Sequence, residues 1–550
     1  MKGRFQGSYR EGLVVMAFWL AGWSVMGDAS EARQSVILKP VQGNDMQTTI
    51  VTPLGQILGQ AAEKNPEISV FRGVPYAEPP LESRRFAPPG RLEPWDGVLD
   101  AREDRLPCWQ AHSEDAFVWS RGAFERSEDC LHLTIWSRLA AKEPQPVMVW
   151  LHGGAHTGGW GHHPIFDGSA LAAEGVVLVS VNYRLGPWGF LAAPLLSTQS
   201  PRNASGNYGL LDVVEALHWV QNNIAAFGGD PSNVTLFGQS AGSQSVCALM
   251  TSPHAVGLFH KAIGQSAACL GDFKVDGAGL DTGQKLLNAL SIDSIESLRA
   301  VQNAALLEAA ESNHWAARSR IVVDGDVLPT SPRARFEQNQ ARKMPLMVGS
   351  LANEGIGLIP LNETLSEAAF EGFLTATFSR LDEGRDALFA AYNEALQLSF
   401  GHAQHAMVTD LFMAHSMREW ATFNARHVSD TYVYYMSHVP PACRIYRPDS
   451  PELDLPGGPR SAGAYHSGDL ALVFGSMDLV GCGWNASDHA VSKRMIRYWT
   501  QFAKTGDPNG SGLPEWAPWG EQNQPLELGR DFSMNEEALG EKLAALKRAL

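Results

Sequence analysis

The sequence predicts an α/β protein built on a mostly parallel sheet, and three observations lead to that prediction. Short apolar runs typical of buried strands recur along the 550 residues, stretches with helical spacing separate them, and one serine stands between two glycines directly after such a run. Strands that alternate with helices favour a parallel sheet covered on both faces. Catalytic groups in such sheets gather beyond the carboxyl ends of the strands.

The strands and helices are predicted from their apolar patterns. The predicted strands cover residues 147–151, 176–181, 233–237, 345–348 and 432–435. Apolar residues at three-to-four-residue spacing predict a helix within residues 210–227. Residues 272–311 are rich in helix formers and lack strand runs, so we expect a helical insertion there. We therefore expect one domain, with insertions over the mouth of the site.

The composition is typical of a globular protein and argues against nucleic-acid binding. The chain is 44% hydrophobic and 19% charged, which is ordinary for a globular protein. Its formal net charge is -16, and it has no basic run beyond the extreme N-terminus. The electrostatic pattern of nucleic-acid binding is therefore missing, and we expect no nucleic-acid partner.

The N-terminus has the layout of an export signal. Basic residues occur among the first ten positions, an apolar stretch covers residues 13–26, and small residues follow at 27–30. We predict a signal peptide over residues 1–29 and a single domain over 30–550. The alternative is an uncleaved anchor. No second apolar stretch is long enough to span a bilayer, so we expect a secreted or periplasmic protein without stable membrane insertion.

The six cysteines fit an oxidising compartment and show no paired C-x-x-C spacing typical of metal sites. Six cysteines can pair in 15 ways, so the pattern alone fixes no disulfide. We expect no metal site.

The serine that stands between two glycines is Ser240, in Gly238-Gln239-Ser240-Ala241-Gly242. A tight turn from strand to helix holds such a serine in a strained conformation and exposes its hydroxyl as a nucleophile. Glycines two residues to either side let the strand and the helix approach. The alternative is an ordinary surface turn, so the other parts of a catalytic site must decide.

A serine nucleophile needs a base and an acid that orients the base. In hydrolases with this turn the chain order is serine, acid, histidine. Glu354 follows the predicted strand at 345–348, and His466 lies later in a loop with glycine nearby. For an isolated glutamate or histidine the alternative is a solvated or merely structural position.

The tetrahedral intermediate of ester cleavage needs backbone N–H donors for its negative oxygen. The residue after the serine, Ala241, supplies one such donor. Others should come from a glycine-rich turn after an earlier strand, and residues 152–155, His-Gly-Gly-Ala, follow the predicted strand at 147–151. The alternative is a plain glycine turn, but consecutive small residues also let the main chain approach a substrate closely.

Further motifs carry a family resemblance. In chain order they are FRGVPYAEPP at 71–80, SEDCL at 127–131, NYRLG at 182–186, GNYGLLD at 206–212, FGGDP at 227–231, VFG at 473–475 and FAKTGDPN at 502–509. The chain resembles the type-B carboxylesterase/lipase family from about residue 48 to about 520. The resemblance implies an α/β-hydrolase fold, hydrolysis of small-molecule esters through an acyl-serine intermediate, and no metal or organic cofactor.

Carried over by position, the resemblance implies roles for single residues. Ser240 is similar to the family's nucleophile, His466 to its general acid/base, and Glu354 to the orienting acid. The oxyanion donors implied are the N–H groups of Gly154, Ala155 and Ala241. Cys108 and Cys130 are similar to the first disulfide pair of the family. The pairing of the other four cysteines stays open.

Two departures from the family bear on the substrate. Gln239 stands where the family commonly has glutamate, which removes a negative charge beside the reacting centre. The loop between Cys108 and Cys130 also lacks the tryptophan stretch with which cholinesterases receive a quaternary ammonium. Trp109 or Trp119 could replace that tryptophan, although loop aromatics more often pack locally. We therefore expect uncharged or anionic esters.

Three functions compete. The first is a serine carboxylesterase acting on small esters. The second is a lipase acting on aggregated lipid esters, which would need an exposed apolar surface around the mouth of the site. The third is a non-catalytic adhesion or interaction protein with the same fold, because fold alone does not fix function. The presence of serine, glutamate and histidine in the expected order favours the first.

Overall fold

The computed structural model describes residues 47–113, 117–271, 274–315, 321–447, 453–520, 523–535 and 539–550. The predicted signal peptide, residues 1–29, lies outside these ranges. Among the residues described, no helix combines the length and the apolar character needed to cross a bilayer.

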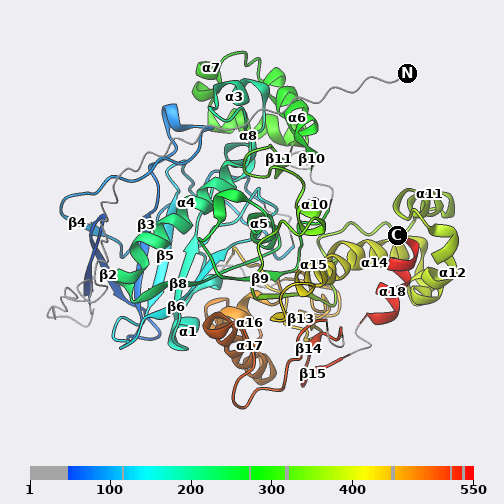
Figure 1. Ribbon diagram of the computed structural model, residues 1–550. Helices are drawn as coiled ribbons and strands as arrows, with labels where there is room; N and C mark the ends of the chain where they lie inside the picture. The colour runs from blue at the N-terminus through cyan, green and yellow to red at the C-terminus, as the bar shows by residue number, and fades with distance from the viewer. Residues whose placement is uncertain are drawn as a thin grey trace, which may run out of the picture.

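A large mixed sheet forms the centre of the molecule (Figure 1). Its central strands run parallel in the order β7 (Val177–Val181), β6 (Gln145–Leu151), β8 (Gly229–Gln239), β9 (Lys261–Gln265), β12 (Leu346–Leu351), β13 (Thr431–Met436) and β14 (Leu526–Leu528). Antiparallel strands extend both edges: β1 (Gln47–Thr52), β2 (Gly55–Ala61), β3 (Ser69–Pro75) and β5 (His132–Ser137) on one side, and β15 (Phe532–Met534) on the other. β4 (Val98–Asp100) pairs with β2. The predicted mostly parallel α/β sheet is confirmed.

Helices cover both faces of this sheet (Figure 1). One face carries α4 (Tyr208–Asn223), α5 (Ala241–Leu249) and α15 (Ser416–Ala425), and the other carries α1 (Ser169–Ala173), α16 (Leu470–Phe474) and α17 (Ala486–Thr505). Alternate side chains of β6 enter different cores, since Val149 packs in one cluster and Trp150 in the other. Both are fully buried, as the period of two along a strand between two helical layers requires.

The helical insertion expected at residues 272–311 is present in the described part of that range. It comprises α6 (Asp276–Ala289), α7 (Ile295–Ala300) and α8 (Asn303–Ser312). The sequence did not predict the short parallel pair β10 (Lys274–Val275) and β11 (Val322–Val323) beside it. Three further short helices are α2 (Gly186–Phe190), α3 (Pro194–Gln199) and α10 (Pro332–Glu337).

A second helical unit has a core of its own. It comprises α11 (Glu367–Thr377), α12 (Leu381–Ala391), α13 (Asn393–Leu398) and α14 (Phe400–Asp410), joined by the C-terminal helix α18 (Gly540–Ala549). Phe370, Leu388 and Leu546 are buried together in this core. In Figure 1 these helices lie to one side of the sheet, with red α18 against α12.

Candidate active site

Ser240 occupies the predicted turn between strand and helix. Strand β8 ends at Gln239 and helix α5 begins at Ala241, so the serine alone makes the turn. Its φ is 56° and its ψ is -123°, a conformation that residues with a Cβ rarely adopt. A Cβ on Gly242 would overlap the carbonyl oxygen of Leu151, so this position has no room for a larger residue. The backbone therefore has the form of a nucleophile elbow.

Glu354 and His466 meet in the fold although they are far apart in the chain. His466 Nδ1 lies 2.6 Å from Glu354 Oε2. Because a carboxylate oxygen only accepts, Nδ1 donates and Nε2 is left with an acceptor lone pair. Glu354 is fully buried and His466 almost so, and Glu354 Oε1 accepts the N–H of Leu351 at 2.8 Å. The carboxylate is thus fixed from both sides and sets the tautomer of the imidazole.

The loops that carry these two residues are held together by Asn353. Its N–H donates to the carbonyl oxygen of Ala464 at 2.9 Å, and its Oδ1 accepts the N–H of Ala464 at the same distance. Asn353 and Tyr465 form an isolated parallel bridge. Because the next residue on each side is Glu354 or His466, this bridge places the acid beside the base.

The second ring nitrogen of His466, Nε2, is contacted by Gln239, the residue before Ser240. Gln239 Nε2 lies 3.1 Å from His466 Nε2 and donates to it. The hydrogen bond that the structure gives to this nitrogen therefore comes from Gln239 and not from Ser240 Oγ. The sequence indicated Gln239 as a missing charge but gave no sign of this contact.

The glycine-rich turn after β6 lies against Ser240. A Cβ placed on Gly153 would lie 3.1 Å from the Cβ of Ser240. Gly154 has φ 101° and Ala155 has φ 56°, so the turn runs through the left-handed region. Within the described part of the chain, the N–H groups of Gly154, Ala155 and Ala241 donate to no protein acceptor. Three unused donors therefore sit on the two turns that adjoin the serine.

Two buried histidines fix that turn. His152 stacks on Tyr183 at a centroid distance of 4.5 Å, and the Tyr183 hydroxyl donates to the carbonyl oxygen of His152 at 2.6 Å. His156 Nε2 lies 3.0 Å from Ser245 Oγ on α5. Burial lowers the pKa of His152 to about 4, so this ring is neutral at pH 7. These contacts hold the turn rigidly against the start of α5.

A second buried carboxylate, Asp469, lies three residues after His466 in the chain. Asp469 is fully buried, and its Oδ2 accepts from Gln265 Nε2 at 2.6 Å. Burial, opposed by the hydrogen bond from Gln265 and assisted by the nearby Glu354 carboxylate, raises the pKa of Asp469 to about 6. Asp469 could not be singled out from the sequence, because nothing in the local pattern distinguishes it from an ordinary helix-capping aspartate.

The disulfide Cys108–Cys130 is present, and it closes a loop that touches the site at two places. Near one end, Gln110 exchanges two hydrogen bonds with the backbone of Gly159, at 2.7 and 3.0 Å. Further along, Trp119 packs on His466 with ring centroids 5.8 Å apart and donates to Ser467 Oγ. Two further disulfides join Cys247 to Cys269 and Cys443 to Cys482.

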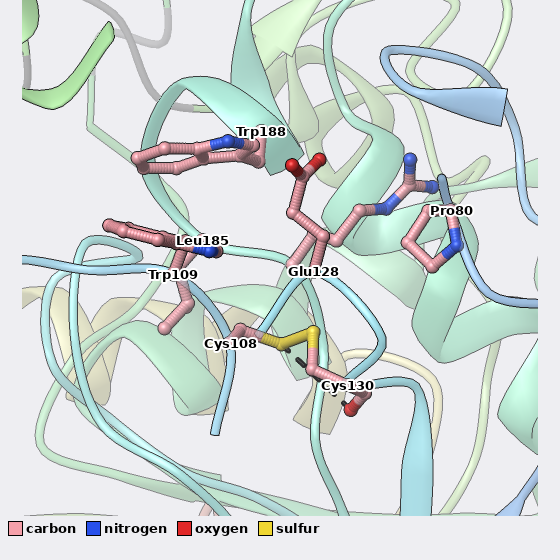
Figure 2. Close-up of a pocket in the computed structure, with 8 residues that line it drawn as sticks. Pro80, Cys108, Trp109, Glu128, Cys130, Leu185 and Trp188 are labelled. Carbon is pink, nitrogen blue, oxygen red and sulfur yellow. Dashed lines mark hydrogen bonds between the residues drawn. A yellow bond between two sulfur atoms is a disulfide. The ribbon is translucent and has the colours of Figure 1, made fainter. Parts of the chain in front are cut away.

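Trp109 packs locally beside the first disulfide. Figure 2 shows its ring next to that of Trp188, above the Cys108–Cys130 bond, and the two centroids are 5.9 Å apart. The guanidinium of Arg126 lies 4.3 Å from the centroid of Trp109. A protein cation thus already occupies this ring, which argues against Trp109 as a receptor for a cationic substrate. The cavity here, about 10 Å³, has room for about one water molecule.

Comparison with known proteins finds similar esterases along almost the whole chain. The family model described as the carboxylesterase family matches residues 46–545. A human protein named cocaine esterase is 32% identical, with 92% of this chain and 93% of the relative covered. Fumonisin B1 esterase of Sphingopyxis macrogoltabida is 32% identical, with 94% of each chain covered. A solved carboxylesterase of Geobacillus stearothermophilus is 29% identical and superimposes with a TM-score of 0.75. The match covers 90% of this chain and 99% of the solved chain.

Proposed function

The chain belongs to the carboxylesterase family and is a carboxylic ester hydrolase with the α/β-hydrolase fold, and from that premise we propose a serine mechanism with a Ser240, His466, Glu354 triad. The observation that carries the proposal is the buried hydrogen bond between Glu354 and His466 beside the strained turn at Ser240.

In this mechanism Ser240 Oγ attacks the carbonyl carbon of the ester, and His466 Nε2 takes the hydroxyl proton. The hydrogen bond from Gln239 to Nε2 is exchanged for one from Ser240 as the substrate binds. The carbonyl oxygen becomes negative and accepts from the N–H groups of Gly154, Ala155 and Ala241.

The intermediate then collapses. The bond from the carbonyl carbon to the alcohol oxygen breaks, and His466 returns its proton to the departing alcohol. A water molecule attacks the acyl-serine, with His466 again the base, and releases the carboxylic acid. Glu354 stays ionised throughout and stabilises the imidazolium that forms twice per turnover.

The test uses two serines of the same turn and helix. Ser240→Ala should lower kcat on a short-chain 4-nitrophenyl ester by about 10⁴-fold or more, because loss of one triad member disables the unit. The control is Ser243→Ala, which removes only the hydroxyl that donates to the carbonyl oxygen of Ala267. A fluorophosphonate probe should label the wild type and the control but not Ser240→Ala. Ester hydrolysis that survives in Ser240→Ala would refute the nucleophile.

The same assays separate the two alternatives. A non-catalytic protein of this fold would neither hydrolyse the ester nor react with the probe. A lipase would act faster on micellar than on dispersed ester, whereas a carboxylesterase acts on both.

We also propose that the protein is exported to an oxidising compartment. Three disulfides among the described residues and the export pattern at residues 1–29 support this. The mass of the N-terminal peptide of the mature protein tests it, and a mature chain that still begins at Met1 would contradict cleavage.

A further inference from the structure

A cation of the disulfide loop lies beside the turn that carries the proposed oxyanion donors. The loop touches that turn through Gln110 and touches the histidine loop through Trp119. Arg121 follows Trp119 by two residues. A Cβ placed on Gly158 would overlap Nη1 of Arg121 and lie 3.0 Å from its Nη2, so the guanidinium packs directly on this glycine.

Gly158 belongs to the catalytic turn itself. Its N–H donates to the carbonyl oxygen of Gly154 at 3.0 Å, and Gly154 also provides one of the proposed oxyanion donors. The same turn approaches the Cβ of Ser240 at Gly153. The guanidinium of Arg121 therefore packs on the same turn that adjoins Ser240.

Arg121 has no carboxylate in ion-pair distance among the residues described. Its Nε donates to the carbonyl oxygen of Ala111 at 3.2 Å, which is a neutral partner. Burial lowers the pKa of Arg121, and the charges of Tyr446 and Glu311 offset this only in part. A guanidinium that is largely removed from water, with no counterion among the described residues, is unfavourable unless an anion completes the site.

The neighbouring charges point to the same ligand. Beside the serine, position 239 is a neutral glutamine, so no carboxylate there repels an anion. The chain as a whole carries a net charge of -16, which repels anions at long range. An anionic substrate would therefore need a cation placed locally at the site.

We propose that Arg121 binds a carboxylate of the substrate, and that the preferred substrates are esters that carry an additional ionised carboxylate. The inference rests on the proposed function and narrows its substrate class. A guanidinium holds a carboxylate through two parallel N–H donors, which fixes orientation as well as charge. Hydrolysis itself follows the steps already given, with the extra carboxylate unchanged in the product.

The test compares esters that differ only in this charge. One pair is 4-acetoxybenzoate and 4-acetoxybenzamide, with the carboxylate on the alcohol part. The other is the mono-4-nitrophenyl ester of adipic acid and its terminal amide, with the carboxylate on the acyl part. For each pair the readout is the ratio of kcat/KM for the anionic ester to kcat/KM for the neutral one. The pair that responds shows on which side of the scissile bond Arg121 binds.

In at least one pair, Arg121→Gln should lower the ratio by about 10- to 100-fold, because a hydrogen-bonded charge is lost. Arg121→Lys keeps the positive charge but loses the planar guanidinium that can hold a carboxylate through two hydrogen bonds. Its ratio should therefore lie between those of the wild type and Arg121→Gln. The control is Arg138→Gln, which removes an arginine paired with Glu67 and should leave both ratios unchanged.

The outcomes are distinguishable. If neither ratio changes in Arg121→Gln while Ser240-dependent hydrolysis of the neutral esters persists, the substrate inference is wrong and the proposed function stands. If the wild type hydrolyses no ester of either pair and no fluorophosphonate labels it, the proposed function fails. Circular dichroism of each variant at the assay temperature confirms that the fold is retained.

Discussion

Ser240 combines a reactive position with a backbone conformation that only glycine adopts without cost. Its φ of 56° and ψ of -123° should cost about 1–3 kcal/mol for any residue with a Cβ. We therefore expect Ser240→Gly to be more stable than Ser240→Ala by about 1 kcal/mol, after the greater entropy that glycine gains on unfolding. Both variants should be inactive. Urea unfolding, followed by tryptophan fluorescence, measures the difference.

The matched control lies three residues later in α5. At Ser243 the backbone is helical, so glycine should be less stable than alanine by about 1 kcal/mol. The order of the two variants should thus reverse between positions 240 and 243. An equal order at both positions would mean that the turn stores no strain.

At the scale of residues, the sequence indicated the three proposed catalytic side chains because chemistry restricts their types and their order. It gave no indication of Asn353, whose hydrogen bonds to Ala464 bring the acid and the base together. It also missed the contact from Gln239 to His466. Both interactions join segments more than a hundred residues apart, and no local pattern records such a pairing.

At the scale of elements, α17 shows how one buried carboxylate secures a helix. Asn485 caps the helix, and Asp488 Oδ2 accepts the N–H of Asn485 in return. The same carboxylate pairs with His438 at 2.7 Å and with Arg460 at 2.6 Å. Burial raises the pKa of Asp488, but the hydrogen bonds from His438 and Arg460 together bring it well below its usual range.

The direction of that shift predicts a pH dependence. Because the folded pKa lies below the unfolded value, near 4, Asp488 stabilises the fold above pH 4 and loses that effect as the pH falls further. Asp488→Asn should lower the free energy of unfolding at pH 7 by about 2 kcal/mol, since it removes the negative charge that accepts hydrogen bonds from Arg460 and from the backbone of Asn485. The difference from wild type should shrink as unfolding is measured below pH 4. Asp478→Asn, at an exposed aspartate, should show neither effect.

Strands were predicted where their own residues form an apolar run, and were missed where their burial depends on partners elsewhere in the chain. The five apolar runs correspond to strands β6, β7, β8, β12 and β13, because strands buried on both faces consist almost wholly of apolar residues. Strand β9, Lys-Ala-Ile-Gly-Gln, was missed although it is buried at every position. Its lysine and glutamine are satisfied by Asn233 and Asp469, partners from other segments, so its burial depends on tertiary contacts.

At the scale of the whole molecule, the C-terminal helix illustrates what the sequence could not give. Helix α18 packs against α12, and Gly384 of α12 lies so close that a Cβ there would be 2.6 Å from Cα of Ala549. The periodicity of either segment predicts an amphipathic helix but does not say which partner covers its apolar face. That this unit has a separate core follows only from the packing.

Two disulfides close loops of equal length, so removing each in turn can distinguish an effect on the stability of the fold from an effect on the active site. Cys108–Cys130 and Cys247–Cys269 each join residues 22 apart, so loop entropy predicts about 3 kcal/mol of stabilisation for each. Replacing either pair by two alanines should therefore lower the free energy of unfolding by a similar amount. Their effects on catalysis should differ, because only the first loop carries Trp119 and Arg121 to the site.

We expect the Cys108→Ala, Cys130→Ala variant to raise KM for esters by about tenfold at a temperature where it remains folded, because binding groups that are not held in place must be ordered by the substrate. The Cys247→Ala, Cys269→Ala variant should keep the KM of the wild type, since this fully buried disulfide joins α5 to the loop after β9 and carries neither Trp119 nor Arg121. Steady-state kinetics, with unfolding curves for both variants, test the comparison. Equal KM values in the two variants would show that the first loop is held over the site by its packing alone, without help from the disulfide.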